Sequence, residues 1–342
     1  MNTDADRPQV WKRLFDAALV FKALAPWQWM YDADAFGVKN PETGEIGTCA
    51  VLGRAGEVFG ISVYLGSEGL TVFEATLNGE IVPGEEDVLF RMKALTLYYD
   101  DRSELDPRDL KRIKDLGYKF RGRNAWPKFR NYLPGFFPWY FSAADARFMT
   151  LALEQAVEVA GRFKENPTLL EPSTRDQYLV RVAEKTGVGL TWRDEWDRPE
   201  PSERAEPAPE PLDDARVEAL KRDAPRRKGM IWEFDVRLVP TPILEGERPY
   251  YPRVILCLDQ KSQMVLGTKM IGPPADAAAI GDGLMEVMER LGAAPIRMWV
   301  KRWEVLVAVA PLAERLGIEI ALEKKLPTLD RAFAELLSYL GR

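Results

Sequence analysis

Apolar residues in the first part of the chain follow helical and strand spacings in turn. From Trp11 to Leu24 they recur at steps of three and four residues, which predicts an amphipathic helix over residues 7–24. Shorter alternating patterns, separated by turn residues, predict strands over residues 27–31, 35–39, 45–52, 58–65, 95–99, 178–184 and 190–195. Further helices are predicted over residues 68–77, 107–116 and 143–163. The first part therefore predicts an α+β domain, an antiparallel sheet with helices against one face.

A second series of elements begins after residue 228. From Trp232 to Leu238, apolar residues alternate with charged ones, which predicts a strand over residues 231–239. Further strands are predicted over residues 253–258, 264–270, 296–300 and 318–322. Helices are predicted over residues 280–291 and 303–316, and Pro327 opens a last one. This order predicts an α/β domain with a five-stranded mixed sheet.

The two series are separated by a proline-rich stretch. Residues 199–211 contain five prolines and four glutamates without an apolar period, which is typical of an extended, solvated linker. We therefore predict an α+β domain over residues 1–198 and a second domain over residues 229–342. Residues 199–228 between them are predicted to be an acidic, proline-rich linker with a basic lead-in to the second domain.

Composition narrows the class of protein. The 342 residues are 46% hydrophobic and 29% charged, which suits a folded two-domain chain, and the net charge of -6 does not favour nucleic acid overall. Nucleic-acid binding would therefore need a local basic patch. No run of about 18 apolar residues and no signal-peptide core occur, and the two cysteines form no metal-binding motif. We expect a cytoplasmic protein without a membrane anchor.

The absence of histidine excludes several active sites. A Ser-His-Asp or Cys-His triad cannot form, and neither can a metal site that requires imidazole. The remaining chemistry would use carboxylates, lysine, tyrosine, serine or cysteine.

The order of elements from Ile231 to Leu322 resembles the ribonuclease-H-like fold of transposases and integrases. The resemblance implies that the first and fourth strands lie side by side and that acids on them bind two Mg²⁺ ions, which clamp a phosphodiester. It places the first acid at Asp235. Glu304 could supply the second acid and Asp330 the third. The resemblance thus implies a metal-dependent nuclease or phosphotransferase that uses these three residues with Mg²⁺.

A departure from this pattern favours an inactive domain. The fourth strand ends in Lys301-Arg302, where the fold would carry an acid, and a basic residue there repels Mg²⁺. The simpler reading of Asp235 is a charged residue on a half-solvated strand, with Arg237 on the same face. We therefore expect no metal site and no cofactor.

The densest aromatic segment of the chain covers residues 118–140. Basic residues alternate with its rings, and the candidate nucleic-acid contacts are Arg121, Arg123, Trp126, Lys128 and Arg130. In the alternative reading, which we favour, the rings belong to the core and the basic side chains cover their edges. The two readings differ in whether the rings are exposed.

The whole chain resembles a group of bacterial two-domain proteins of unknown function. The similar segments are Ala25–Met30, Phe36–Ile46, Val63–Gly69, Trp126–Phe129, Leu133–Trp139 and Tyr251–Ile255. The resemblance supports the two-domain layout and carries no activity. Together these observations predict a cytoplasmic binding or regulatory protein with an inactive ribonuclease-H-like domain. Its partner is unknown and could be a nucleic acid or a protein.

Overall fold

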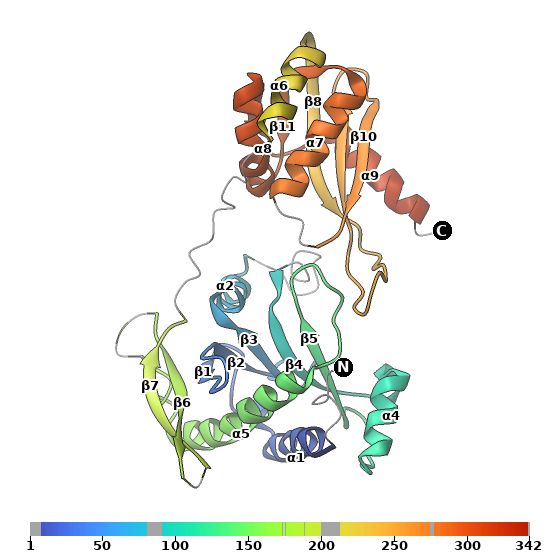
Figure 1. The fold of residues 1–342 in the computed structure, drawn as a ribbon. Helices are drawn as coiled ribbons and strands as arrows, with labels where there is room; N and C mark the ends of the chain where they lie inside the picture. The colour runs from blue at the N-terminus through green and yellow to red at the C-terminus, as the bar shows by residue number, and fades with distance from the viewer. Residues whose placement is uncertain are drawn as a thin grey trace. The chain divides into compact units, whose positions relative to one another are not determined.

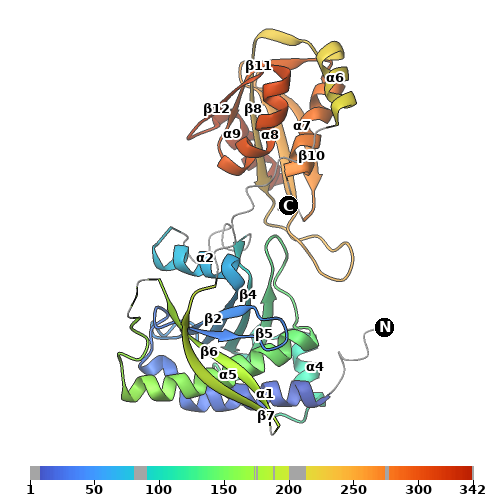
Figure 2. The same ribbon diagram turned by 60° about the vertical axis from the view of Figure 1, so that its left-hand side comes forward.

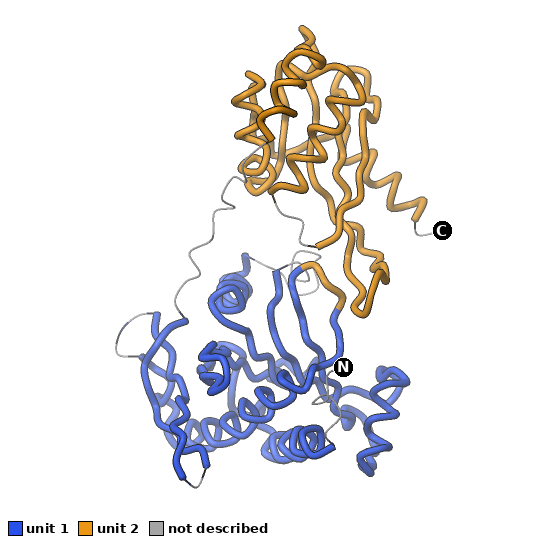
Figure 3. The backbone as a smooth tube through the Cα atoms, in the orientation of Figure 1, with its two compact units in different colours: residues 1–134, 138–202 blue, residues 135–137, 203–342 orange. Residues whose placement is uncertain are grey.

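The computed structural model describes residues 8–80, 91–172, 174, 176–187, 189–199, 213–273 and 277–340. The chain forms two compact units (Figure 3). Unit 1 comprises Met1–Pro134 and Pro138–Ser202, and unit 2 comprises Gly135–Phe137 and Glu203–Arg342. Each unit has its own sheet and its own core.

Unit 1 is built on a sheet that has seven strands in the described residues, in the order β5-β4-β3-β2-β1-β6-β7. The strands are β1 (Phe36–Lys39), β2 (Ile46–Leu52), β3 (Gly60–Leu65), β4 (Ala94–Asp100), β5 (Trp126–Tyr132), β6 (Tyr178–Thr186) and β7 (Gly189–Asp197). Most neighbouring strands run antiparallel, as predicted, but β1 and β6 run parallel.

Helices lie against both faces of this sheet, which corrects the prediction of one covered face. The helices are α1 (Pro8–Leu24), α2 (Gly66–Leu77), α4 (Pro107–Asp115) and α5 (Ala143–Glu165). Figure 2 shows α1 and α5 running side by side, and both pack on the sheet face that carries Cys49 and Val51. On the other face, Leu70 and Phe73 of α2 pack against Ala50. Alternate residues of β2 therefore contact different helices.

One local prediction in unit 1 is wrong, and one strand was missed. Residues 27–31 do not form a strand, because Ala25 adopts a left-handed conformation and Pro26 opens a short 3₁₀ helix, η1 (Pro26–Gln28). A second short helix, η2 (Arg102–Glu104), follows β4. Strand β5 was not predicted, although it pairs with β4 along its whole length. Its mixture of basic, aromatic and proline residues hides the alternation that predicts strands.

Unit 2 has the predicted fold class, an α/β arrangement with a five-stranded mixed sheet in the described residues. The strands are β8 (Arg226–Leu238), β9 (Arg253–Asp259), β10 (Val265–Ile271), β11 (Ala294–Val300) and β12 (Glu319–Leu322), in the order β10-β9-β8-β11-β12. The first three strands are antiparallel neighbours, whereas β8, β11 and β12 run parallel. Strands one and four of the domain thus lie side by side, as the ribonuclease-H-like fold predicts.

Helices cover both faces of the second sheet (Figure 1). They are α6 (Asp214–Asp223), α7 (Ala277–Leu291), α8 (Trp303–Leu316) and α9 (Pro327–Leu340). Trp232 and Phe234 of β8 belong to the core with α6, α7 and α8. Helix α9 packs on the opposite face, against Leu256 of β9. None of the described helices has the length and apolar composition needed to span a lipid bilayer.

The end of the predicted linker is part of unit 2. Helix α6 begins at Asp214, where Asp213 accepts hydrogen bonds from the first turn, and Val217 and Leu220 are buried in the core. Strand β8 already begins at Arg226. Residues 213–228 are therefore not linker, because two apolar side chains one turn apart suffice to dock the short helix. Residues 200–212 lie outside the described residues, and their linker character stays a prediction.

Candidate functional site

Asp235 lies at the centre of the second sheet and is fully buried. It stands on β8 between Glu233 and Arg237, and strand alternation turns all three side chains to the same face. Asp235 pairs directly with Leu256 of β9, whose side chain packs against α9. The face was predicted to be half-solvated, and instead α9 covers it.

Arg237 links Asp235 to Asp330 across this covered face. Its Nε lies 2.9 Å from Oδ2 of Asp235, and its Nη2 donates a hydrogen bond of 2.7 Å to Oδ1 of Asp330 in the first turn of α9. The contact with Asp235 is an ion pair but not a hydrogen bond, because the Nε–H group does not point at the carboxylate. Both carboxylate oxygens of Asp235 are buried without a hydrogen-bond partner. The two candidate acids are thus brought together by one arginine.

Burial dominates the electrostatics of Asp235. Loss of solvation raises the pKa of its carboxyl group, and the positive charges of Arg237, Arg302 and Lys301 offset part of that effect. The basic pair Lys301-Arg302 at the end of β11 therefore acts on Asp235, as its position in the sequence suggested.

Glu233 is a buried acid that sequence reasoning missed. Its Oε2 accepts a hydrogen bond of 2.7 Å from the backbone nitrogen of Leu329, in the first turn of α9. A carboxylate at this place satisfies a free N–H group and interacts favourably with the positive end of the helix. Since nothing in the sequence indicates that α9 begins beside β8, no local signal could have identified this role.

Glu304, the second candidate acid, is exposed in the first turn of α8. Glu304 was a candidate because it follows the strand predicted to lie beside the strand of Asp235, and the structure confirms that β11 and β8 are neighbours. However, among the residues that the structure describes, no three histidine, cysteine or acidic side chains are grouped so that they could hold a metal ion.

The aromatic and basic segment 118–140 contributes mainly to the core of unit 1. Phe129 is buried, and its ring lies 5.3 Å from that of Phe15 in α1. The rings of Tyr118 and Phe120 stack on the ring of Phe15, with distances of 5.2 Å and 6.4 Å between ring centres. The half-buried Trp126 packs edge-on against Phe120 at 5.7 Å. These contacts agree with the structural reading of the rings.

Arg130 is buried and engaged with the start of α4. Its Nη2 lies 2.8 Å from Oδ2 of Asp106 and 2.6 Å from Oδ2 of Asp109, and its Nη1 donates to Oδ1 of Asp109 at 3.0 Å. Tyr140 donates a hydrogen bond of 2.6 Å to Asp106. Burial and this carboxylate raise the pKa of Tyr140 to about 12. Arg130 thus has two carboxylate partners within the protein.

The other basic candidates of this segment differ in their surroundings. Lys128 forms an ion pair of 3.1 Å with Asp100. Arg121 is exposed, and the side chain of Arg123 is 92% exposed with its Nε 3.9 Å from Oδ2 of Asp101. Only Arg121 and Arg123 of the five candidates combine positive charge with free access to solvent.

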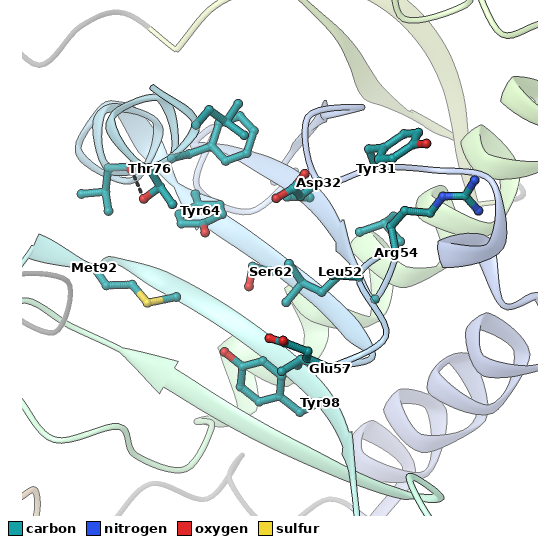
Figure 4. Close-up of a pocket in the computed structure, with 18 of the residues that line it drawn as sticks. Tyr31, Asp32, Leu52, Arg54, Glu57, Ser62, Tyr64, Thr76, Met92 and Tyr98 are labelled. Carbon is teal, nitrogen blue, oxygen red and sulfur yellow. Dashed lines mark hydrogen bonds between the residues drawn. The ribbon is translucent and has the colours of Figure 1, made fainter. Parts of the chain in front are cut away.

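A cavity of about 760 Å³ in unit 1 was not predicted at all (Figure 4). It lies over the sheet face that α2 flanks, and its lining includes Asp32, Glu57, Tyr64 and Tyr98. These residues come from two loops and two strands, at separations that give no motif. Sequence periodicity marks Tyr64 and Tyr98 as strand residues and carries no signal of the hollow between them.

Two solved structures are similar to part of the chain. The crystal structure of the catalytic core domain of BIV integrase matches with 14% identity and a TM-score of 0.24, covering 32% of this chain and 68% of that chain. The simian T-cell lymphotropic virus intasome in complex with PP2A regulatory subunit B56 gamma matches with 18% identity and a TM-score of 0.26, covering 34% and 42%. Matches this weak carry no conclusion about chemistry.

Family models match both units. Residues 216–337 match the model described as Domain of unknown function (DUF6930), and residues 11–181 match Domain of unknown function (DUF7309). No curated protein sequence matches the chain. Because residues 11–181 make up half of the 342 residues, the chain belongs to the family described as Domain of unknown function (DUF7309).

Proposed function

We propose that this protein is a cytoplasmic, non-catalytic binding or regulatory protein whose ribonuclease-H-like unit has no metal-dependent activity. The observation that carries the proposal is the position of Arg237, with its guanidinium in contact with Asp235 and Asp330 at 2.9 Å and 2.7 Å. An ion pair between these residues uses the carboxylates that the resemblance would assign to a metal.

The physical argument concerns charge. Mg²⁺ requires several oxygen ligands around one point, and carboxylates usually supply the negative charge. Here a guanidinium that remains protonated at all physiological pH values stands between the two acids. Lys301 and Arg302 add further positive charge near Asp235. A dication at this place would meet repulsion from three basic side chains, which supports a structural role for Asp235.

The proposal is tested by metal binding. The full chain is titrated with Mg²⁺ and with Mn²⁺ in a calorimeter. The heats of metal binding should be the same for wild type, Asp235→Asn and the control Glu335→Gln. Glu335 is a suitable control because it is an exposed acid on α9, the helix that carries Asp330. Incubation with single- and double-stranded DNA and RNA in the presence of either metal should give no cleavage.

One combination of results would overturn the proposal and favour the metal-dependent nuclease or phosphotransferase. It is stoichiometric metal binding, or metal-dependent cleavage, that Asp235→Asn abolishes and Glu335→Gln retains. Loss of the same signal in Glu304→Gln and in Asp330→Asn would then identify a metal site shared between Asp235, Glu304 and Asp330.

A further inference from the structure

We propose that the cavity of unit 1 binds a small organic amine, a molecule with an apolar or aromatic body and one protonated amino group. The cavity has a volume of about 760 Å³, within the range of roughly 300–1,000 Å³ that small-molecule sites occupy. This inference concerns unit 1 alone and does not depend on the inactivity of unit 2.

Large side chains of the sheet stand beside small ones on the face that carries the cavity. In one row, Tyr64 of β3 and Tyr132 of β5 stand on either side of Ala94 of β4. In another row, Tyr98 of β4 stands beside Gly60 of β3, which has no side chain. The rings of Tyr64, Tyr98 and Tyr132 line the cavity together with the small side chains of Ala50 and Ser62, and α2 closes one side of it.

Uncharged hydroxyl groups form the floor of the cavity. Burial raises the pKa of Tyr64 to about 12, with smaller contributions from Tyr98 and Asp32, while a hydrogen bond with Ser62 lowers it. Burial also raises the pKa of Tyr98, and hydrogen bonds with Tyr132 and Thr96 offset part of that effect. The tyrosines are therefore protonated at neutral pH. They offer hydrogen bonds and ring faces without a full charge.

The remaining walls are largely apolar. The apolar side chains in the lining include Leu52, Val58, Val72, Phe73, Leu77 and Met92. Such walls favour a ligand that brings its own apolar surface, because both surfaces are then removed from water.

Charge at the cavity selects the sign of the ligand. Among the described residues of the lining, the charged ones are Asp32, Glu57 and Arg54, so negative charge is in excess by one there. Arg54 is already engaged, since its Nη1 donates a hydrogen bond to the carbonyl of Gln28 and its guanidinium carbon lies 5.0 Å from the centre of the Tyr31 ring. In the part of the lining that the structure describes, an anionic ligand would thus find no unengaged basic side chain, whereas a cation would find two carboxylates.

The carboxylates can reach a bound amine. Within the described residues, Asp32 and Glu57 form no ion pair, and Asp32 accepts a hydrogen bond of 3.0 Å from the backbone nitrogen of Ala33. Figure 4 shows Asp32 and Glu57 among the side chains that line the cavity, and the charge of Asp32 acts on the hydroxyl group of Tyr64. An ammonium group bound in the cavity would be attracted by either carboxylate and, through cation–π attraction, by the faces of the tyrosine rings.

The experiment uses three probes that share one skeleton and differ in charge. Naphthylethylamine, naphthylethanol and naphthylacetate are titrated into the full chain, and binding is followed by calorimetry. We expect the Kd of naphthylethylamine to be roughly twofold to fivefold lower than that of naphthylethanol, the range for a solvent-exposed ion pair. Naphthylacetate should bind weakest of the three.

Variants locate the site and the charge. Leu52→Trp and Thr76→Trp place an indole in the cavity from different elements, and each should abolish binding of all three probes. Circular dichroism confirms that each variant is folded. Asp32→Asn and Glu57→Gln should remove the preference for the amine but leave alcohol binding unchanged. Glu165→Gln, which changes an exposed acid on the helix across the sheet, should alter nothing.

Three outcomes would overturn the proposal. The first is that no probe binds at millimolar concentration. The second is that binding survives in both folded tryptophan variants, which would place the probes elsewhere. The third is that naphthylacetate binds as tightly as naphthylethylamine, or that the Asp32 and Glu57 variants still prefer naphthylethylamine. Either result would show that the two acidic side chains do not select the ligand.

Discussion

Nε of Arg237 lies 2.9 Å from Oδ2 of Asp235 on the covered face of the second sheet. The two residues are two positions apart on one strand, so their side chains point to the same face. Both are buried, and Arg237 also reaches Asp330 on α9. Arg237 therefore attaches a helix to a sheet and places a permanent positive charge beside the buried Asp235.

Replacing the arginine should destabilise unit 2. Arg237→Met leaves a buried carboxylate without its partner, and we expect a loss of about 3–5 kcal/mol in the free energy of unfolding. Hydrogen exchange of the β8 amides reports this unit by itself. The matched control is Arg297→Met, which removes an exposed ion pair of 2.7 Å with Glu319 and should cost at most about 1 kcal/mol. Equal losses in the two variants would contradict a special role for Arg237.

The pH dependence of stability should change when Asp235 is made neutral. Burial raises the pKa of Asp235 in the folded state. Protonation of Asp235 therefore stabilises the folded wild-type protein below the unfolded-state pKa, and this stabilisation is lost as pH rises through the folded-state pKa. Asp235→Asn does not ionise, so its stability relative to wild type should increase as pH rises above about 4. Thermal unfolding between pH 4 and pH 8 measures this difference, with Glu335→Gln as the charge control. A relative stability that falls with pH would show that the Arg237 ion pair outweighs burial.

Arg130 should be a stability residue and not a ligand-binding residue. Arg130→Met leaves the carboxylates of Asp106 and Asp109 without their guanidinium, and we expect a loss of about 3–5 kcal/mol. Arg123→Ala, at a side chain that is 92% exposed, should change stability by less than about 0.5 kcal/mol. Hydrogen exchange of α4 and β5 provides the measurement. A small effect of Arg130→Met would mean that its ion pairs are replaceable by water.

Nucleic-acid binding through the aromatic and basic segment would have to use its two exposed arginines. If wild type shifts single-stranded DNA or RNA at low salt, the double variant Arg121→Ala/Arg123→Ala should weaken the shift and reduce the salt slope by about 1–2. Lys324→Ala/Lys325→Ala, at exposed positions in unit 2, removes the same charge and should leave the shift unchanged. Equal effects of the two double variants would indicate non-specific attraction.

Hydrophobic periodicity was sufficient for most elements of this chain. The alternation from Trp232 to Leu238 and the helical stripe from Ile280 to Leu291 correspond to β8 and α7. Local sequence also located two helix starts, since Asp106 and Ser142 both form capping boxes. Such features depend on residues within one or two turns of each other, so they can be read along the chain. Strand β5 was missed because its proline, basic and aromatic residues hide the alternation. Residues 27–31 do alternate, but Pro26 opens a short 3₁₀ helix there after the left-handed Ala25.

The alternation along β8 is enough to tell which of its residues share a face, whereas the element that covers this face depends on how distant parts of the chain pack. Alternation placed Asp235 and Arg237 together, but a polar alternation is compatible both with solvent and with a covering helix that brings its own charge. Helix α9 supplies that charge through Asp330, from 93 residues away along the chain. The cavity of unit 1 has the same origin, because its lining is assembled from strands, loops and a helix that only the folded sheet brings together.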